Sequence, residues 1–348
     1  MAYATKREID GALEAASRAR SLAEIPDTWR AAAAAATAAG DAPLAHELWQ
    51  RVAAAEPDRG ATWLGLARAC EAVQDVPAAV AAYLKAAQVE PTHSTTLMVA
   101  ERLAALNVAG TDVPPAQRVR IAIIGSSTLD YVRAYLEVAC RQVGLSPDFY
   151  MGPFGQFAQE ILDPSGGLYR FAPDVVIVAI HGLALFPDLY DRFVDYDVEA
   201  RRAMAGEVVE QVAELIAQLT ARTTALVLLH TFATPQYSPL GTLDLSDSFG
   251  QSAMFAAINN GLAERVRQNF PSVRLVDEDR VYGRIGKRHV TDPRLWYLAR
   301  IGIGEGALGA LTLEYMRFIK ALKGLTRKCL VLDLDNTLWG GVIGEVGA

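Results

Sequence analysis

A repeat with a period of 34 residues runs through the first hundred residues and constrains the fold of that region. Six pairs of aromatic, acidic, alanine or proline residues share this spacing: Trp29 and Trp63, Asp41 and Asp75, Pro43 and Pro77, Ala45 and Ala79, Trp49 and Tyr83, Pro57 and Pro91. A period of about 20 to 50 residues is typical of architectures in which one small unit stacks on the next. The region should therefore be an array of like units, without one large core.

Each copy of the repeat contains two alanine-rich segments separated by Asp-x-Pro, and its second segment ends at a proline. This order predicts two helices joined by a turn, and "TWLGLARACEAVQDVPAAVAAYLKAAQVEP" resembles a tetratricopeptide repeat. Ala67, Ala79 and Ala86 would let helices approach closely, while Trp49 and Tyr83 would fill the space between them. We therefore expect repeats of this type over residues 1–107, ending in a capping helix at 94–107.

A plain alanine-rich helical bundle is the alternative for this region, because "AAAAAATAAG" could pack almost anywhere. The chain has about two and a half copies of the repeat, and about three are usually needed for a stable array. The repeats should therefore pack against the next domain and serve as an interaction module, possessing no catalytic role of their own.

The pattern changes after a linker at residues 108–117, and short apolar runs then alternate with helical segments. The β-rich runs are VRIAIIG at 119–125, DVVIVAI at 174–180, TALVLLH at 224–230 and VRLVDE at 273–278. Apolar strands separated by helices, such as the one expected at 198–219, indicate a mostly parallel sheet that is covered on both faces. We expect a three-layer α/β domain over residues 118–325.

The loop Gly125-Ser126-Ser127-Thr128 follows the first expected strand and precedes a helix expected at 129–143. Ligands of parallel sheets bind where strands end, so these four residues are candidates for substrate binding, and Asp292, in the later segment KRHVTDPRLWY, is a fifth candidate. The arrangement resembles the SGNH, or GDSL, hydrolase fold, in which a serine after the first strand is the nucleophile. By that resemblance, Ser127 stands at the nucleophile position.

The base that such a serine needs is missing from its expected place in the sequence. The SGNH fold supplies it from a late Asp-x-x-His, but here Asp292 is followed three residues later by Leu295. We therefore favour a degenerate, ligand-binding version of the fold over a hydrolase, with an esterase or acyltransferase that uses Ser127 as an alternative. His181 and His230 each end an apolar strand, and we interpret both as polar residues whose hydrogen bonds are satisfied at the rim of the sheet.

The segment "KCLVLDLDNTLWGGVIGE" delivers two carboxylates, Asp333 and Asp335, at the end of an apolar strand. Side chains repeat every two residues along a strand, so both carboxylates lie on one face. Two such anions repel each other unless a cation intervenes, and their oxygen atoms suit Mg²⁺. This pattern predicts a Mg²⁺ site at Asp333 and Asp335.

The motif formed by Asp333, Asp335, Asn336 and Thr337 resembles the first motif of the haloacid dehalogenase superfamily. The resemblance implies that Asp333 is a nucleophile that attacks phosphorus and that Asp335 exchanges protons with the leaving group and with water. Members that lack the second aspartate are dehalogenases, so its presence favours phosphoryl chemistry.

The longer string, together with the segments before it, resembles the FkbH-like proteins over residues 118–348. These proteins join an SGNH-like domain to a haloacid dehalogenase domain, and some load a glyceryl unit from a phosphorylated three-carbon substrate onto an acyl carrier protein for polyketide synthesis. The resemblance implies Mg²⁺ as cofactor and an acyl carrier protein as partner. A carrier-protein or partner-docking module without catalysis is the alternative.

Residues 326–348 hold only the first dehalogenase motif, and the superfamily also needs a later Ser or Thr, a Lys and an acidic pair. We therefore expect the chain to be the N-terminal part of a longer enzyme and to lack phosphatase activity by itself.

Composition excludes several other classes. The formal net charge is −7, which argues against a nucleic-acid-binding surface. Three scattered cysteines predict neither a disulfide framework nor a cysteine-rich metal site. The N-terminus lacks the apolar core of a signal peptide, and no apolar run is long enough to span a membrane. These features are typical of a cytoplasmic protein.

Overall fold

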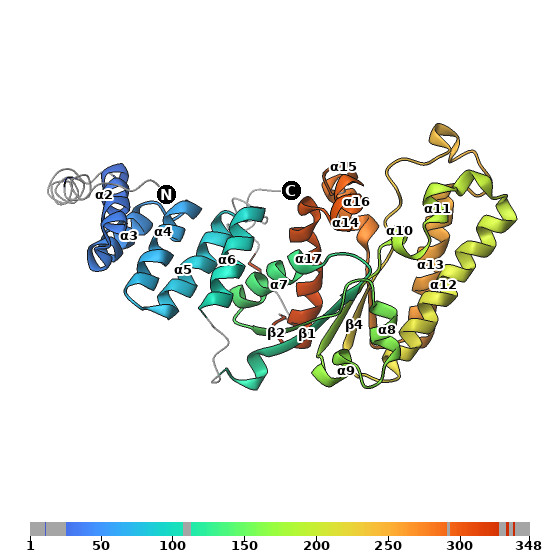
Figure 1. Ribbon diagram of the computed structural model, residues 1–348, viewed down its shortest axis with the longest axis horizontal. Helices are drawn as coiled ribbons and strands as arrows, with labels where there is room; N and C mark the ends of the chain where they lie inside the picture. Colours follow the sequence, from blue (N-terminus) through green and yellow to red (C-terminus); the bar gives the residue numbers. More distant parts are fainter. Residues whose placement is uncertain are drawn as a thin grey trace, which may run out of the picture.

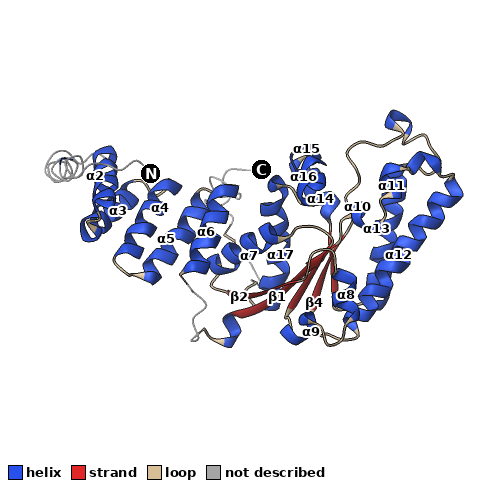
Figure 2. Cartoon of the chain, in the orientation of Figure 1, coloured by secondary structure: helices blue, strands red, loops and turns tan. Residues whose placement is uncertain are grey.

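The computed structural model describes residues 26–106, 113–290 and 293–326, together with Gly11, Leu332, Asp333 and Thr337. Helical repeats form one end of the elongated molecule and an α/β domain forms the other (Figure 1). The strands all belong to the second part (Figure 2). The multidomain architecture predicted from the sequence, helical repeats followed by a parallel α/β domain, is confirmed.

The 34-residue period reappears in the positions and the caps of the repeat helices. The helices are α2 (Pro26–Ala39), α3 (Ala42–Ala55), α4 (Gly60–Ala72), α5 (Val76–Val89) and α6 (His93–Ala105). Asp41 and Asp75 each precede a second helix, and their side chains accept hydrogen bonds of 3.1 Å from Leu44 N and Ala78 N. An aspartate at this position satisfies one of the backbone N–H groups that a helix leaves unpaired at its start.

The repeat core consists of small residues around a few aromatic rings, as the sequence predicts. Ala67, Ala79 and Ala86 are fully buried, and so is Tyr83, while Trp49 is 9% exposed. Alanine at helix contacts lets the backbones approach closely, and the large rings occupy the remaining space.

The last repeat helices share a core with the α/β domain. Ala134 and Val138 lie on α7 (Asp130–Gln142), the first helix of that domain, and pack among buried residues of α4, α5 and α6. At the same contact, the Nδ1 atom of His93 lies 3.1 Å from the Tyr135 hydroxyl. The expectation that the repeats pack against the next domain is therefore met.

The α/β domain contains one parallel five-stranded sheet with the order β2-β1-β3-β4-β5. Its strands are β1 (Arg118–Gly125), β2 (Ser146–Met151), β3 (Val175–Ala179), β4 (Leu226–His230) and β5 (Val273–Val276). Four of them coincide with the predicted apolar runs. The sequence analysis missed β2, an edge strand that contains Pro147 and the exposed Asp148, because proline and polar residues are tolerated where one edge stays unpaired.

Helices cover both faces of this sheet. One face packs against α8 (Phe157–Leu162), α9 (Gly167–Phe171), α12 (Val198–Thr220) and α13 (Gln251–Asn269). The other packs against α7, α14 (Glu278–Ile285) and α17 (Glu305–Leu322). Shorter helices cap the carboxyl edge: α10 (Gly182–Leu185), α11 (Asp188–Asp191), α15 (Lys287–Val290) and α16 (Pro293–Ala299). Short 3₁₀ helices lie at Pro115–Gln117, Phe193–Asp195 and Gly241–Leu243.

None of the helices in the described ranges is long and apolar enough to cross a lipid bilayer.

Candidate functional site

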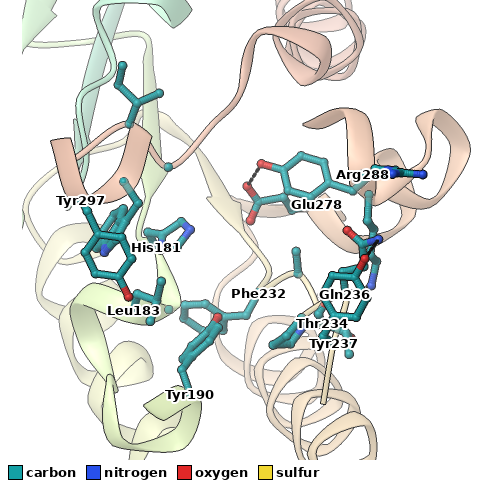
Figure 3. A pocket seen from close by; sticks show the side chains of 18 residues that line it. His181, Leu183, Tyr190, Phe232, Thr234, Gln236, Tyr237, Glu278, Arg288 and Tyr297 are labelled. Atoms are coloured by element: carbon teal, nitrogen blue, oxygen red, sulfur yellow. Dashed lines mark hydrogen bonds between the residues drawn. The ribbon is translucent and has the colours of Figure 1, made fainter. Parts of the chain in front are cut away.

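The candidate site lies at the carboxyl edge of the sheet, where β3, β4 and β5 end. Ligands of parallel sheets bind at this edge. A cavity of about 430 Å³ lies at this edge, and Figure 3 shows the side chains that line it.

The loop after β1 is attached firmly to the end of β3. A Cβ atom at Gly125 would lie 2.2 Å from the carbonyl oxygen of Ala179, so only glycine fits there. The Ser126 hydroxyl accepts a 2.8 Å hydrogen bond from the backbone N–H of His181. Two of the five predicted binding residues, Gly125 and Ser126, thus act locally by joining two strands.

Ser127 lies behind a strap formed by residues 299–304, and only 6% of it is exposed. Thr128 fastens the strap, since its N–H donates to the Arg300 carbonyl and its hydroxyl to the Ala299 carbonyl. Gly302 presses against the serine, because a Cβ there would lie 3.2 Å from Ser127 Oγ. Within the described ranges the Ser127 side chain has no hydrogen bond to a histidine, so this geometry contains no assembled catalytic triad.

Beneath the cavity, a buried polar network joins β4, α14 and α17. The Nε2 atom of His230 and the Tyr315 hydroxyl are 2.7 Å apart. The other ring nitrogen of His230 lies 3.7 Å from Glu278 Oε1, which also accepts a 2.5 Å hydrogen bond from Tyr282. His230 therefore has polar partners at the rim of the sheet, as the sequence analysis expected.

Glu278 is a carboxylate in a buried position, with 6% of the residue exposed. Burial by itself would raise the pKa of its carboxyl group, but the nearby His230 ring and the hydrogen bond from Tyr282 outweigh burial and bring the pKa below its usual value. Burial also raises the pKa values of Tyr282 and Tyr315 well above normal. Glu278 is therefore ionised at neutral pH, and both phenols are protonated.

His181 differs from His230, and our interpretation of it as a satisfied rim residue is wrong. Its ring stacks on Trp296 with centroids 4.4 Å apart, but its Nδ1 atom is buried without any hydrogen-bond partner in the described structure. Burial lowers the pKa of the imidazole, and the nearby Glu278 carboxylate only partly opposes that effect. His181 is thus a neutral imidazole held at the cavity floor.

Ser127, His181, His230 and Glu278 surround a small internal void of about 10 Å³, closed by Ala179, Ile180 and Ile303. This volume is close to the minimum for one water molecule, and the walls offer several hydrogen-bonding groups. His181 and Glu278 line both this void and the large cavity, so they form the partition between them.

Aromatic side chains dominate the walls of the large cavity: Tyr190, Phe232, Tyr237, Tyr282, Trp296 and Tyr297. Lys287 lies at the rim, where its ammonium group donates to the Thr234 carbonyl and to Asp279, both at 2.7 Å. Figure 3 shows Glu278 and His181 directed toward the cavity from opposite sides, and Arg288 directed away from Glu278.

Only part of the dehalogenase motif lies within the described residues. Asp333 and Thr337 are exposed, while Asp335, Asn336 and Asp292 lie outside the described residues. Carboxylate oxygens suit Mg²⁺, but no group of three or more His, Cys, Asp or Glu in the described part could hold a metal ion. The described residues therefore form no metal site.

Sequence reasoning missed Glu278, Tyr282, Trp296 and Tyr315. One signal for Glu278 was available, since it lies two residues after the last strand, where side chains of a parallel sheet meet. The pairing of Tyr315 with His230, 85 residues apart, leaves no local pattern.

Comparison with solved structures finds the N-terminal part of the protein BF1531 from Bacteroides fragilis, which contains a phosphatase domain and was crystallised with Mg. The TM-score is 0.55 at 19% identity, and the similarity covers 66% of this chain but 59% of that one. This likeness shows a common fold. This chain thus matches less than two thirds of the length of that structure.

No curated protein sequence matches the chain. A family model does match residues 120–319, and it describes the N-terminal domain of FkbH. Since this match covers more than half of the chain, the protein belongs to the FkbH N-terminal domain family.

Proposed function

We propose that this chain is the N-terminal part of a Mg²⁺-dependent enzyme that removes a phosphoryl group and transfers a glyceryl unit to an acyl carrier protein. The match to the FkbH N-terminal domain carries the proposal, because the segment that follows residue 319 contains Asp333 and Asp335. The acyl carrier protein and a place in polyketide or related biosynthesis come from the resemblance to FkbH-like proteins.

Asp333 and Asp335 are the residues that would hold Mg²⁺, which supplies positive charge to the phosphoryl oxygens when it is bound. Asp333 would attack phosphorus, and Asp335 would give a proton to the leaving group and later take one from water. The exposure of Asp333 in the described structure leaves its carboxylate accessible to a substrate.

For the α/β domain we propose a role in docking and ligand binding, and not in ester hydrolysis. The position of Ser127 supports this role, since the strap around Gly302 covers its hydroxyl and no described histidine is hydrogen-bonded to it. Together with the helical repeats, the domain would present a surface to the carrier protein.

The test uses the protein as its gene encodes it, an acyl carrier protein and a phosphorylated three-carbon acyl donor. We expect Mg²⁺-dependent phosphate release and a matching mass increase of the carrier protein. Asp333→Asn should abolish both. Phosphate release and loading that persist in Asp333→Asn would contradict the proposal.

The esterase alternative is tested with a simple aryl ester and the Ser127→Ala variant. We expect no turnover that depends on Ser127. Hydrolysis that is lost in Ser127→Ala but retained in Asp333→Asn would contradict the binding role and would show that Ser127 is catalytic.

A further inference from the structure

The cavity of about 430 Å³ at the carboxyl edge of the sheet contains a carboxylate, Glu278, that its surroundings only partly compensate. Among the described residues, the Glu278 carboxylate accepts a hydrogen bond from Tyr282, and a ring nitrogen of His230 lies 3.7 Å from it. A carboxylate has about four acceptor positions, and an ionised group with few partners is costly to bury. A ligand that donates hydrogen bonds and carries positive charge would remove this cost.

The cationic side chains of the cavity rim are not placed to provide that charge. The ammonium group of Lys287 is held by Asp279 and by the Thr234 carbonyl. The Arg288 side chain points away from Glu278 in Figure 3. Arg300 lies over the Trp296 ring, 5.3 Å from its centroid, and does not line the cavity.

The walls offer the second feature that organic cations require. Tyr190, Phe232 and Tyr297 line the same cavity as the carboxylate, and aromatic faces attract ammonium groups through their quadrupole. His181, with an unpartnered and buried Nδ1 atom, adds a neutral hydrogen-bonding group to the same floor.

We propose that this cavity binds a small organic ammonium compound, with the cationic group between Glu278 and the aromatic walls. The volume of about 430 Å³ is sufficient for a small metabolite and too small for a folded domain. The site is separate from the proposed phosphoryl chemistry at Asp333, and it does not depend on that chemistry.

The experiment compares ligands that differ in charge but not in shape. Choline is titrated against its neutral isostere, in which a tert-butyl group replaces the trimethylammonium group, and tyramine against the alcohol in which a hydroxyl replaces the amine. Isothermal titration calorimetry near neutral pH should show that at least one cation binds about tenfold more tightly than its neutral partner, which corresponds to the strength of a charge-assisted contact.

Two variants locate the binding. Glu278→Gln keeps the shape of the side chain and should weaken the binding of the cation about tenfold or more. Tyr297→Leu removes one wall and should also weaken it, whereas Leu298→Ala, on the same helix at a residue that does not line the cavity, should have no effect. Tyr297 is 67% exposed, so this change should not affect folding.

Three results would overturn the proposal: equal affinity for cation and neutral isostere, unchanged binding in Glu278→Gln, or no saturable binding of either cation up to about 10 mM. If circular dichroism shows that Glu278→Gln does not fold, the proposal is tested by the affinities of the cation and neutral ligand pairs and by the Tyr297→Leu variant. Unchanged binding in Tyr297→Leu would then also overturn it.

Discussion

Replacing His181 by phenylalanine tests whether a neutral, unpartnered imidazole lies at the cavity floor. A phenyl ring preserves the stack on Trp296, whose centroid lies 4.4 Å away, and removes the buried Nδ1 atom that lacks a partner. A buried polar atom without a hydrogen bond costs about 1–3 kcal/mol. His181→Phe should therefore raise the free energy of unfolding near neutral pH by about 1 kcal/mol.

The same change should alter the response to acid. Burial keeps the pKa of His181 in the folded protein below its ordinary value of 6.5, so the unfolded chain takes up the proton first as the pH falls. Stability is then lost at up to about 1.4 kcal/mol per pH unit, from near the unfolded value down to the folded pKa. Glu278 also has a lowered pKa, and its contribution is lost only below its ordinary value of 4.5. The two groups thus act in separate pH windows.

Urea unfolding followed by circular dichroism at about pH 7.5, 6.5 and 5.5 measures both effects. The wild-type protein should lose more stability than His181→Phe over this interval, while His289→Gln, at an exposed histidine, should behave like the wild type. Equal acid sensitivity of His181→Phe and the wild type would refute the neutral buried imidazole. A clear loss of stability in His181→Phe near neutral pH would contradict the prediction that the unpartnered Nδ1 atom lowers the free energy of unfolding.

Three further predictions concern packing, and urea unfolding or limited proteolysis checks them. Gly302→Ala should destabilise the protein by about 1–3 kcal/mol, because the new methyl group would lie 2.7 Å from the His181 ring, whereas Gly206→Ala, with open space around it, should not destabilise. Tyr315→Phe should cost about 1–3 kcal/mol, since it breaks a fully buried hydrogen bond. Ala134→Glu should place a charge between the repeats and the α/β domain and so speed proteolytic separation of the two parts.

The repeat region and the central strands could be predicted from the sequence because local patterns specify them. The 34-residue spacing places Asp41 and Asp75 at equivalent helix starts, and one hydrogen bond of each aspartate explains its presence. Strands β1, β3, β4 and β5 are apolar because helices cover both of their faces. Strand β2 escaped prediction because an edge strand need not be continuously apolar.

The sequence indicated the carboxyl edge of the sheet, but none of the residues 125–128 that it nominated lines the cavity. A parallel sheet predicts that residues after β1 and β3 meet, and Ser126 and His181 are indeed hydrogen-bonded there. Nothing local indicates that the strap at 299–304 covers Ser127, because the strap and the serine are far apart in the sequence. Whether a polar side chain at a strand end has hydrogen-bond partners depends on such distant contacts. The sequence therefore did not distinguish His181 from His230.

The difference between these two histidines also explains where function is expected in the domain. His230 contacts a tyrosine hydroxyl from α17, and such a satisfied group serves stability. His181 keeps an unpartnered nitrogen beside an ionised carboxylate, an arrangement that costs folding free energy and that packing alone does not require. Buried polar groups without a hydrogen-bond partner occur mainly at sites where a bound ligand supplies that partner. Ser127, which by resemblance stands at the nucleophile position of SGNH hydrolases, is covered here, so we expect ligand recognition in this domain to depend on His181 and Glu278 instead.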